Sequence, residues 1–308
     1  MRVALSVDME GIAQLVDWRE LIAGCDAYWQ TGVARMTADT VAAAEGLLAG
    51  GASEVIVFDN HASGNPCNLE ADALPPGARL ETWSVFDWRS HGVEAMLQVG
   101  YHARCGVSGF LSHTYLPRLR LRVDDELISE SHGRAWAAGV PLLGIVGNDG
   151  IGRTLGSLAG TPFLAVQHST SHDRVRPAFG EDAESAGVIK VFARDAMRGA
   201  KAIAPPLAPR DAVLAASLPA APGQAAALAE AGFRQVGDTE FHVPIRTWAD
   251  AREPLAAVLG AAWQPWAPLF QGLDVTSPSA VAAQPPDRLR ALDEAFAEWA
   301  TEEEPEWL

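Results

Sequence analysis

The sequence is poor in basic residues and in cysteine, and it contains no long apolar run. Lys and Arg together number 23 against 39 Asp and Glu, so the 308 residues carry a formal net charge of −16. A chain of this sign is poorly suited to bind phosphate backbones or anionic lipid surfaces. No stretch reads as the roughly 20 apolar residues that a membrane-spanning helix needs. The composition therefore argues against nucleic acids and membranes as partners.

The cysteines and the first residues bear on the compartment. Cys25, Cys67 and Cys105 are widely spaced and form no CxxC pair, so we expect small apolar side chains in a reducing environment rather than a disulfide framework. The opening MRVALSVDMEG reaches its first acidic residue, Asp8, too soon to hold the apolar region of a signal peptide. Together these features predict a cytoplasmic protein.

Several common catalytic motifs are missing. The sequence has no GxxxxGK[ST], no HExxH and no GxSxG, which are the signatures of P-loop proteins, zincins and α/β-hydrolases. The glycines of GNDGIGRTLG, residues 147–156, miss the GxGxxG spacing of a dinucleotide-binding loop. Any chemistry must therefore come from residues that are dispersed along the chain.

What the sequence does contain, in its first half, is an alternation of apolar and helix-compatible segments. The predicted strands are Val3–Val7, Glu54–Phe58, Ala95–Val99, Pro141–Val146 and Thr161–Val166. The predicted helices are Thr37–Leu48, Gly133–Ala138 and Glu181–Ala202. Such alternation predicts an α/β fold with a mostly parallel sheet covered by helices on both faces.

The second half is less regular. Three prolines, Pro205, Pro206 and Pro209, form a stiff joint. The segments that follow indicate a smaller α+β subdomain: Ala212–Leu218, Ala225–Ala231 and Phe233–His242. We therefore expect a metal-binding catalytic α/β domain over 1–204, the α+β subdomain over 210–262, and a Trp- and Pro-rich C-terminal extension over 263–308. In that extension we expect a helix over Leu289–Trp299 and a solvated tail.

The metal-binding expectation comes from acidic and histidine residues at strand ends. Asp8 and Glu10 follow the first predicted strand, Asp59 and His61 follow the second, and His102 follows the third. Any one of them has an ordinary explanation, since a single histidine is usually a surface or hydrogen-bonded residue and an aspartate often caps a helix. Parallel strands, however, bring their carboxyl ends to one edge. Carboxylates mixed with imidazoles at that edge favour a zinc-like divalent ion, and a carboxylate can bridge two.

Two further segments stay ambiguous from the residues alone. His113, in FLSHTY, could contact substrate or could be a buried hydrogen-bonded histidine. Glu126, Glu130 and His132 lie in DDELISESHGRAW just before a predicted helix, where carboxylates also occur simply because the helix dipole favours them.

Five segments then occur in order: SVDMEGIA (6–13), VFDNHASGN (57–65), VGYHAR (99–104), LSHT (111–114) and the SE of 129–130. Together they resemble the zinc D-aminopeptidases of the DppA type. The resemblance runs from Met1 to about Ala202 and more loosely to about Ala262, so the last ~46 residues fall outside it.

The resemblance implies a site with two zinc ions per subunit. Matched residue by residue, Asp8 bridges the ions, Glu10 and His61 complete one, and His102 and Glu130 complete the other. His113 matches the histidine credited with a catalytic role, and Asp59 is expected to orient a ligand.

The activity implied is that of a metallo-aminopeptidase. It hydrolyses the N-terminal amide bond of short peptides, D-amino-acid peptides among them, by attack of a hydroxide shared between the metals. The alternatives are an amidohydrolase that acts on a non-peptide amide or an amino-acid-derived metabolite at the same site, and a non-catalytic metal-binding scaffold. The family also implies a ring-like homo-oligomer, of which a decamer is the expected form.

Two features depart from the family pattern. Gln167, in AVQHSTSHDR, stands where a lysine is expected, which would alter specificity if that lysine contacts substrate. The tryptophans of the extension are also unexpected, and we expect them to serve packing or assembly: Trp263, Trp266, Trp299 and Trp307.

Overall fold

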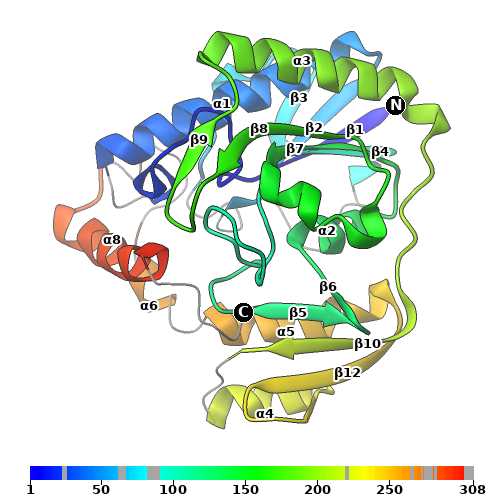
Figure 1. Cartoon of the computed structure of the whole chain (residues 1–308), viewed down its shortest axis with the longest axis vertical. Coiled ribbons are helices and arrows are strands. Elements are labelled where there is room, and N and C mark those ends of the chain that lie inside the picture. Colours follow the sequence, from blue (N-terminus) through cyan, green and yellow to red (C-terminus); the bar gives the residue numbers. More distant parts are fainter. Residues whose placement is uncertain are drawn as a thin grey trace.

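The structure is a computed structural model that describes residues 1–22, 26–61, 67–81, 91–218, 222–263, 267–271, 273, 280 and 283–301. Two β-sheets organise these residues (Figure 1). The larger sheet has seven strands in the order β3-β2-β1-β4-β7-β8-β9, and the smaller sheet has five in the order β11-β12-β10-β5-β6.

The larger sheet confirms the predicted fold class. Its strands are parallel except for β9, which pairs antiparallel with β8. Their bounds are β1 Arg2–Val7, β2 Glu54–Asp59, β3 Ala78–Glu81, β4 Ala95–Tyr101, β7 Leu142–Asn148, β8 Phe163–Ser169 and β9 Val175–Pro177. All five strands predicted for the first half are present. The sequence analysis missed β3 and β9, which are short edge strands with little apolar signal of their own.

Helices cover both faces of this sheet. Side chains alternate along a strand, so Val3 and Leu5 of β1 pack with the long helices α1 (Asp26–Ala49) and α3 (Asp182–Gly199). Ala4, between them, faces the opposite side and packs with α2 (Glu130–Ala138). Figure 1 shows α1 and α3 above the sheet and α2 below it.

The smaller sheet is antiparallel and takes strands from both halves of the chain. Its strands are β5 Arg120–Val123, β6 Glu126–Leu127, β10 Arg210–Ser217, β11 Arg234–Gln235 and β12 Glu240–Thr247. Two helices pack with its apolar face, α4 Pro222–Glu230 and α5 Arg252–Trp263. Leu121 and Val123 of β5 alternate with arginines and lie in this second core. The division of the chain into 1–204, 210–262 and 263–308 stays a prediction.

The helix of the C-terminal extension packs on the main domain. α8 (Pro286–Thr301) buries Leu289 and Leu292 in the core that also holds the apolar face of α1. The remaining short helices are α6 Ala267–Phe270 and the 3₁₀ turns η1 Trp18–Leu21, η3 Ala71–Ala73, η5 Asp149–Arg153, η6 Gly156–Leu158, η7 Ala200–Ala202 and η8 Trp248–Ala251. Cys25, Trp266, Trp307 and the side chain of Trp299 lie outside the described residues.

Two smaller expectations can be compared with the structure. Cys67 is a half-buried free thiol, and Cys105 is buried. In the part of the chain that the structure describes, no helix has both the length and the apolar character needed to cross a membrane.

The segment that follows β1 is pressed against the end of β4. The Gly11 amide donates to the Gly100 carbonyl oxygen at 2.7 Å. Gly100 has a φ of +80°, and a Cβ at this position would overlap the main-chain carbonyl of Asp8. Glycine is the residue that tolerates both constraints. The close approach places the residues after β1 next to those after β4.

Candidate metal centre

The structure gathers six side chains at the carboxyl edge of the parallel sheet. Neighbouring strand ends deliver four of them, the N-terminus of α2 supplies the fifth, and the loop between β4 and β5 supplies the sixth. In chain order they are Asp8, Glu10, His61, His102, His113 and Glu130. The register explains the meeting, because Val7 of β1 pairs with Asp59 of β2 on one side and with Val99 of β4 on the other.

Asp8 lies between two of the imidazoles. Its Oδ1 is 3.7 Å from His61 Nδ1, and its Oδ2 is 3.7 Å from His102 Nε2. His61 Nδ1 also lies 3.3 Å from Glu10 Oε2, and His102 Nε2 lies 3.6 Å from Glu130 Oε1. Each oxygen of Asp8 therefore faces a different histidine and carboxylate, the arrangement expected of a bridging carboxylate.

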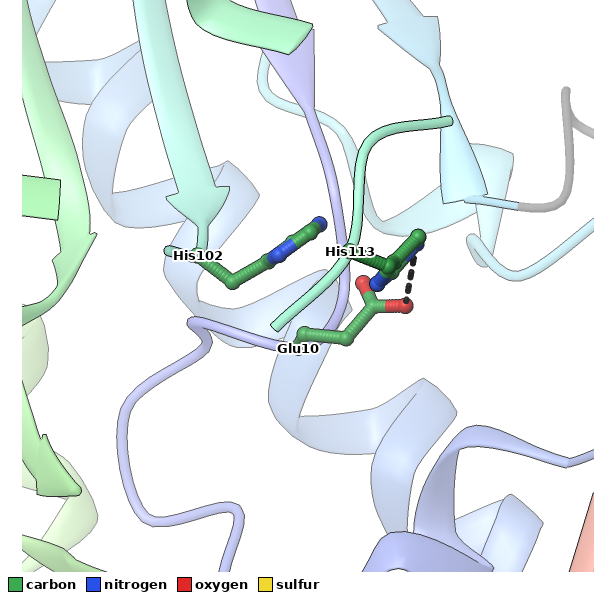
Figure 2. A group of neighbouring side chains, drawn as sticks. All are labelled: Glu10, His102 and His113. Carbon is green, nitrogen blue, oxygen red and sulfur yellow. Dashed lines mark ion pairs between the residues drawn. The ribbon is translucent and has the colours of Figure 1, made fainter. Parts of the chain in front are cut away.

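His113 completes the cluster. Its ring stacks on that of His102, with centroids 4.2 Å apart and planes 14° from parallel. His113 Nε2 lies 3.9 Å from Glu10 Oε1 and 3.6 Å from Glu130 Oε1. Figure 2 shows Glu10, His102 and His113 converging, with the contact between Glu10 and His113 dashed. The sequence left this histidine ambiguous, and the structure places it among the carboxylates.

All three histidines are oriented by main-chain carbonyls. One ring nitrogen of each donates to a carbonyl oxygen: His61 Nε2 to Leu21 at 2.9 Å, His102 Nδ1 to Ala103 at 2.8 Å and His113 Nδ1 to Leu111 at 2.8 Å. A carbonyl oxygen can only accept, so in each ring this nitrogen carries the proton of the neutral form. The other nitrogen faces the carboxylate cluster and is the one that could bind a metal ion. Metal-binding histidines typically have such a second hydrogen bond.

Some donor atoms of the cluster lack hydrogen-bond partners and are placed where a cation could bind them. Asp8 Oδ2 and His102 Nε2 are buried and have no hydrogen-bond partner among the described residues, and a buried polar atom without a partner is costly. Three groups have donor atoms within 4.8 Å of one another: Asp8, Glu10 and His61; Asp8, His102 and Glu130; and Glu10, His102 and His113. Mixed carboxylate and imidazole donors of this kind are suited to zinc.

The pKa values of Asp8, His102 and His61 are shifted by burial and by the neighbouring carboxylates of the cluster, and all three are raised. Burial, and then the nearby Glu10 and Glu130, raise the pKa of Asp8. Burial acts to lower the pKa of His102, but interactions with the carboxylates raise it to about 9. The same competition holds the pKa of His61 well above its usual value. A cluster that attracts protons this strongly also attracts metal cations.

His113 behaves differently from the other two histidines. Burial, and then the neighbouring His102, lower its pKa to about 4. It is therefore neutral at pH 7, with Nδ1 protonated and the lone pair on Nε2.

Asp59 acts on the backbone beside the cluster. Its Oδ1 accepts from the His61 amide at 3.2 Å, and its Oδ2 accepts from the Asn68 amide at 2.7 Å. It thus holds the main chain of His61 rather than the ring.

Other sequence candidates lie apart from the cluster. Glu126 and His132 contact each other at 3.5 Å, and His132 Nε2 donates to the Leu155 carbonyl oxygen. Gln167, expected where the family has lysine, is buried and bonds to the backbone of Ile12.

The α/β sheet and the donors at its carboxyl edge are those of a protein suited to hold divalent metal ions. A family profile described as D-aminopeptidase, peptidase family M55, matches residues 1–255. The chain therefore belongs to the M55 peptidase family. No curated protein sequence matches it.

A solved structure is similar over most of the chain. It is the Zn-dependent D-aminopeptidase DppA from Bacillus subtilis, described as a self-compartmentalizing protease. The two chains are 25% identical, the TM-score is 0.75, and the match covers 86% of this chain and 98% of the other.

Proposed function

We propose that this protein is a zinc-dependent aminopeptidase that hydrolyses the N-terminal amide bond of short peptides, with a D-amino acid as the preferred first residue. The observation that carries the proposal is the orientation of the three histidines. Each is fixed by a main-chain carbonyl so that its other nitrogen faces a buried carboxylate cluster. The proposal is supported by membership of the D-aminopeptidase family.

Five residues would hold two zinc ions. Asp8 is shared between a pocket formed with Glu10 and His61 and a pocket formed with His102 and Glu130. When bound, zinc supplies Lewis-acid polarisation of the scissile carbonyl and lowers the pKa of the attacking water.

His113 is suited to move the proton. It is neutral, its Nδ1 is committed to the Leu111 carbonyl, and its Nε2 lies beside Glu10 and Glu130. Nε2 can take a proton from the nucleophile and return it to the leaving amine, a role typically worth 10²–10⁴-fold in rate. It cannot donate to an oxyanion until it has taken up that proton.

An exopeptidase must recognise the free α-amino group of its substrate. Asp8, Glu10 and Glu130 would be occupied by the two zinc ions, so their charges would not remain free to attract an ammonium group. A neutral α-amino group would instead bind a zinc ion through its nitrogen, which would direct cleavage to the amino end.

Zinc-loaded protein should be assayed against a panel of D- and L-aminoacyl amides, dipeptides and N-acyl compounds. We expect hydrolysis of substrates that have a free α-amino group, fastest for the D series, and none of the N-acyl compounds. Turnover of the N-acyl compounds alone would favour the non-peptide amidohydrolase. Stoichiometric zinc without any turnover would favour a non-catalytic scaffold.

The assembly and the compartment belong to the same proposal. We infer a homo-oligomer from likeness to a protease described as self-compartmentalizing, with a ring of ten subunits as the form that the family resemblance implies. Light scattering should then give about ten times the 32.7 kDa chain mass. A monomeric mass would contradict the ring. Cysteine usage supports a cytoplasmic location.

A further inference from the structure

We propose that Arg134 is a positioning residue that presents a single oxygen of Glu130 to the metal centre, so that it controls one of the two zinc pockets and not the other. This inference rests on the proposed function. Arg134 itself has no place in the motifs that predicted the site, and it does not belong to the cluster of donors.

Arg134 and Glu130 form a buried pair one helical turn apart on α2. Arg134 Nη2 donates to Glu130 Oε2 at 2.8 Å, and both side chains are nearly inaccessible, with exposed fractions of 2% and 6%. The second oxygen, Oε1, accepts from the main-chain amide of Tyr115 at 2.7 Å. It is also the oxygen that lies 3.6 Å from His102 Nε2. Because Oε2 is engaged by the guanidinium, only Oε1 faces the pocket.

The other arm of the guanidinium is fixed to the sheet. Arg134 Nη1 donates to Asn60 Oδ1 at 2.8 Å, and Asn60 Nδ2 donates to Ser6 Oγ at 2.5 Å. Ser6 Oγ in turn lies 2.5 Å from the hydroxyl of Tyr101. The network therefore ties α2 to the ends of β1, β2 and β4.

Three members of this hydrogen-bond network lie next to predicted metal ligands in the sequence. Ser6 lies two residues before Asp8, Asn60 precedes His61, and Tyr101 precedes His102. These three residues hold strands that the sheet ladder already aligns. Glu130 is different, because it comes from a helix outside the sheet. Gln98 of β4 holds the backbone beside Glu130, because its amide donates to the Ser131 carbonyl oxygen at 3.2 Å. Arg134 is the residue that ties the Glu130 carboxylate itself to a strand end.

The chemistry requires arginine rather than a positive charge alone. Two nitrogens of one planar group bond two acceptors on different elements, and a lysine ammonium on a flexible stem cannot reproduce that fork. Arg134 also supplies a buried positive charge beside the acidic cluster. Losing the fork should therefore weaken the Glu130 pocket even where the charge is kept.

The test is a zinc titration of metal-free protein against a competing chelator, for wild type and Arg134→Lys. We expect two zinc equivalents in wild type. In Arg134→Lys one equivalent should keep its affinity and the other should weaken by roughly 10–100-fold, the usual effect of removing a residue that orients a ligand. Arg198→Lys is the matched control, since Arg198 forms an exposed ion pair with Asp195 on α3, and it should leave both equivalents unchanged.

Double variants assign the weakened pocket. On a His61→Ala background Arg134→Lys should still weaken the remaining zinc, and on a His102→Ala background it should have no further effect. If neither Arg134→Lys nor Arg134→Gln folds, Asn60→Ala removes the acceptor of one arm and should weaken the same pocket by a few-fold.

The outcomes separate the two claims. Suppose that an Arg134 variant with wild-type circular dichroism loses zinc affinity equally in both pockets, or in neither. That result would overturn the role of Arg134 and leave the aminopeptidase proposal intact. Wild-type protein that binds no zinc would overturn both.

Discussion

The side-chain amide of Gln167 donates a hydrogen bond to the main-chain carbonyl oxygen of Ile12 at 2.7 Å, two residues beyond Glu10. Gln167 Oε1 accepts from Asn148 Nδ2 at 2.9 Å. Asn148 Oδ1 accepts from the Gly150 amide at 2.8 Å. A main-chain amide can only donate and the Ile12 carbonyl can only accept, so the orientations of both side-chain amides are fixed. At a position where the family resemblance predicts lysine, this protein thus has a buried amide that holds the loop after Glu10 by a hydrogen bond.

Gln167→Met should remove that brace while keeping the size of the side chain. The Ile12 carbonyl and the Asn148 amide would lose their partners, which should cost about 1–3 kcal/mol of unfolding free energy. Rates should fall by about tenfold as the loop carrying Glu10 loosens. Urea unfolding and kcat measurements test this. Gln224→Met is the control, because Gln224 bonds to the Ala261 carbonyl oxygen far from the metal ligands in the α4–α5 layer. An unchanged kcat in Gln167→Met would show that the brace is not needed.

Gly100→Ala should prevent the close approach of the segment after β1 to the end of β4. The new methyl group would overlap the Asp8 carbonyl, and the φ of +80° is strained for alanine. We expect more than about 3 kcal/mol of destabilisation and loss of zinc binding. Gly187→Ala is the control, since Gly187 lies within α3 and a Cβ there meets nothing within 4 Å. It should stabilise the helix by about 0.5–1 kcal/mol.

Asp39 should make stability depend on pH. It is buried in α1, where its Oδ2 accepts from the Ala13 amide at 2.8 Å, and burial raises its pKa to about 8, with a smaller effect of Asp182. Between pH 4 and 8 the folded state keeps the proton and the unfolded state has released it. This group therefore lowers the unfolding free energy as pH rises, by up to about 1.4 kcal/mol per pH unit.

Asp39→Asn removes this titration and keeps an acceptor for the Ala13 amide. The variant should be more stable than wild type at pH 8, and the gain should shrink toward pH 4. Chemical unfolding at pH 4.5, 6 and 8 measures the difference in unfolding free energy between Asp39→Asn and wild type. Asp125→Asn, on the exposed surface, is the control. A gain that grew as pH fell would contradict the assignment.

Removal of zinc should destabilise the protein, because three buried carboxylates would then face one another without a metal cation. Thermal unfolding after chelation should occur at a lower temperature, and added zinc should restore it in proportion to its concentration. At 100 times the dissociation constant the recovery should be about 2.7 kcal/mol. Magnesium is the control, since imidazole nitrogens suit zinc better. Equal recovery with magnesium would argue against a zinc site.

The sequence predicts the parallel sheet well because β1, β2 and β4 are short, apolar and fully buried segments, and their pattern is local. It also places Asp8, Glu10, His61 and His102 together, since parallel strands share an edge. The antiparallel sheet is harder, because β5 is four residues long and pairs with β10 some ninety residues later. Such pairing is set by tertiary contacts and not by propensity.

At the metal site, too, the residues that the sequence alone could not predict are those placed by tertiary contacts. Glu130 lies at a helix N-terminus, where carboxylates are common for other reasons, so only the family resemblance selected it. Arg134 carries no local signal at all, and Gln167 is noticeable in the sequence only as a departure from the family pattern. An arginine on a short helix and a glutamine in a strand become informative only when their partners, Asn60 and Ile12, are known from the fold.

The central claim is that Asp8 joins two zinc pockets that perform the hydrolysis. Zinc equivalents and turnover of a D-aminoacyl amide, measured together for wild type, Asp8→Asn and His61→Ala, test it most directly. We expect two equivalents for wild type, about one for His61→Ala, and fewer than one with at least a 10³-fold loss of kcat for Asp8→Asn. Asp8→Asn protein that keeps two zinc equivalents and the wild-type rate would contradict it.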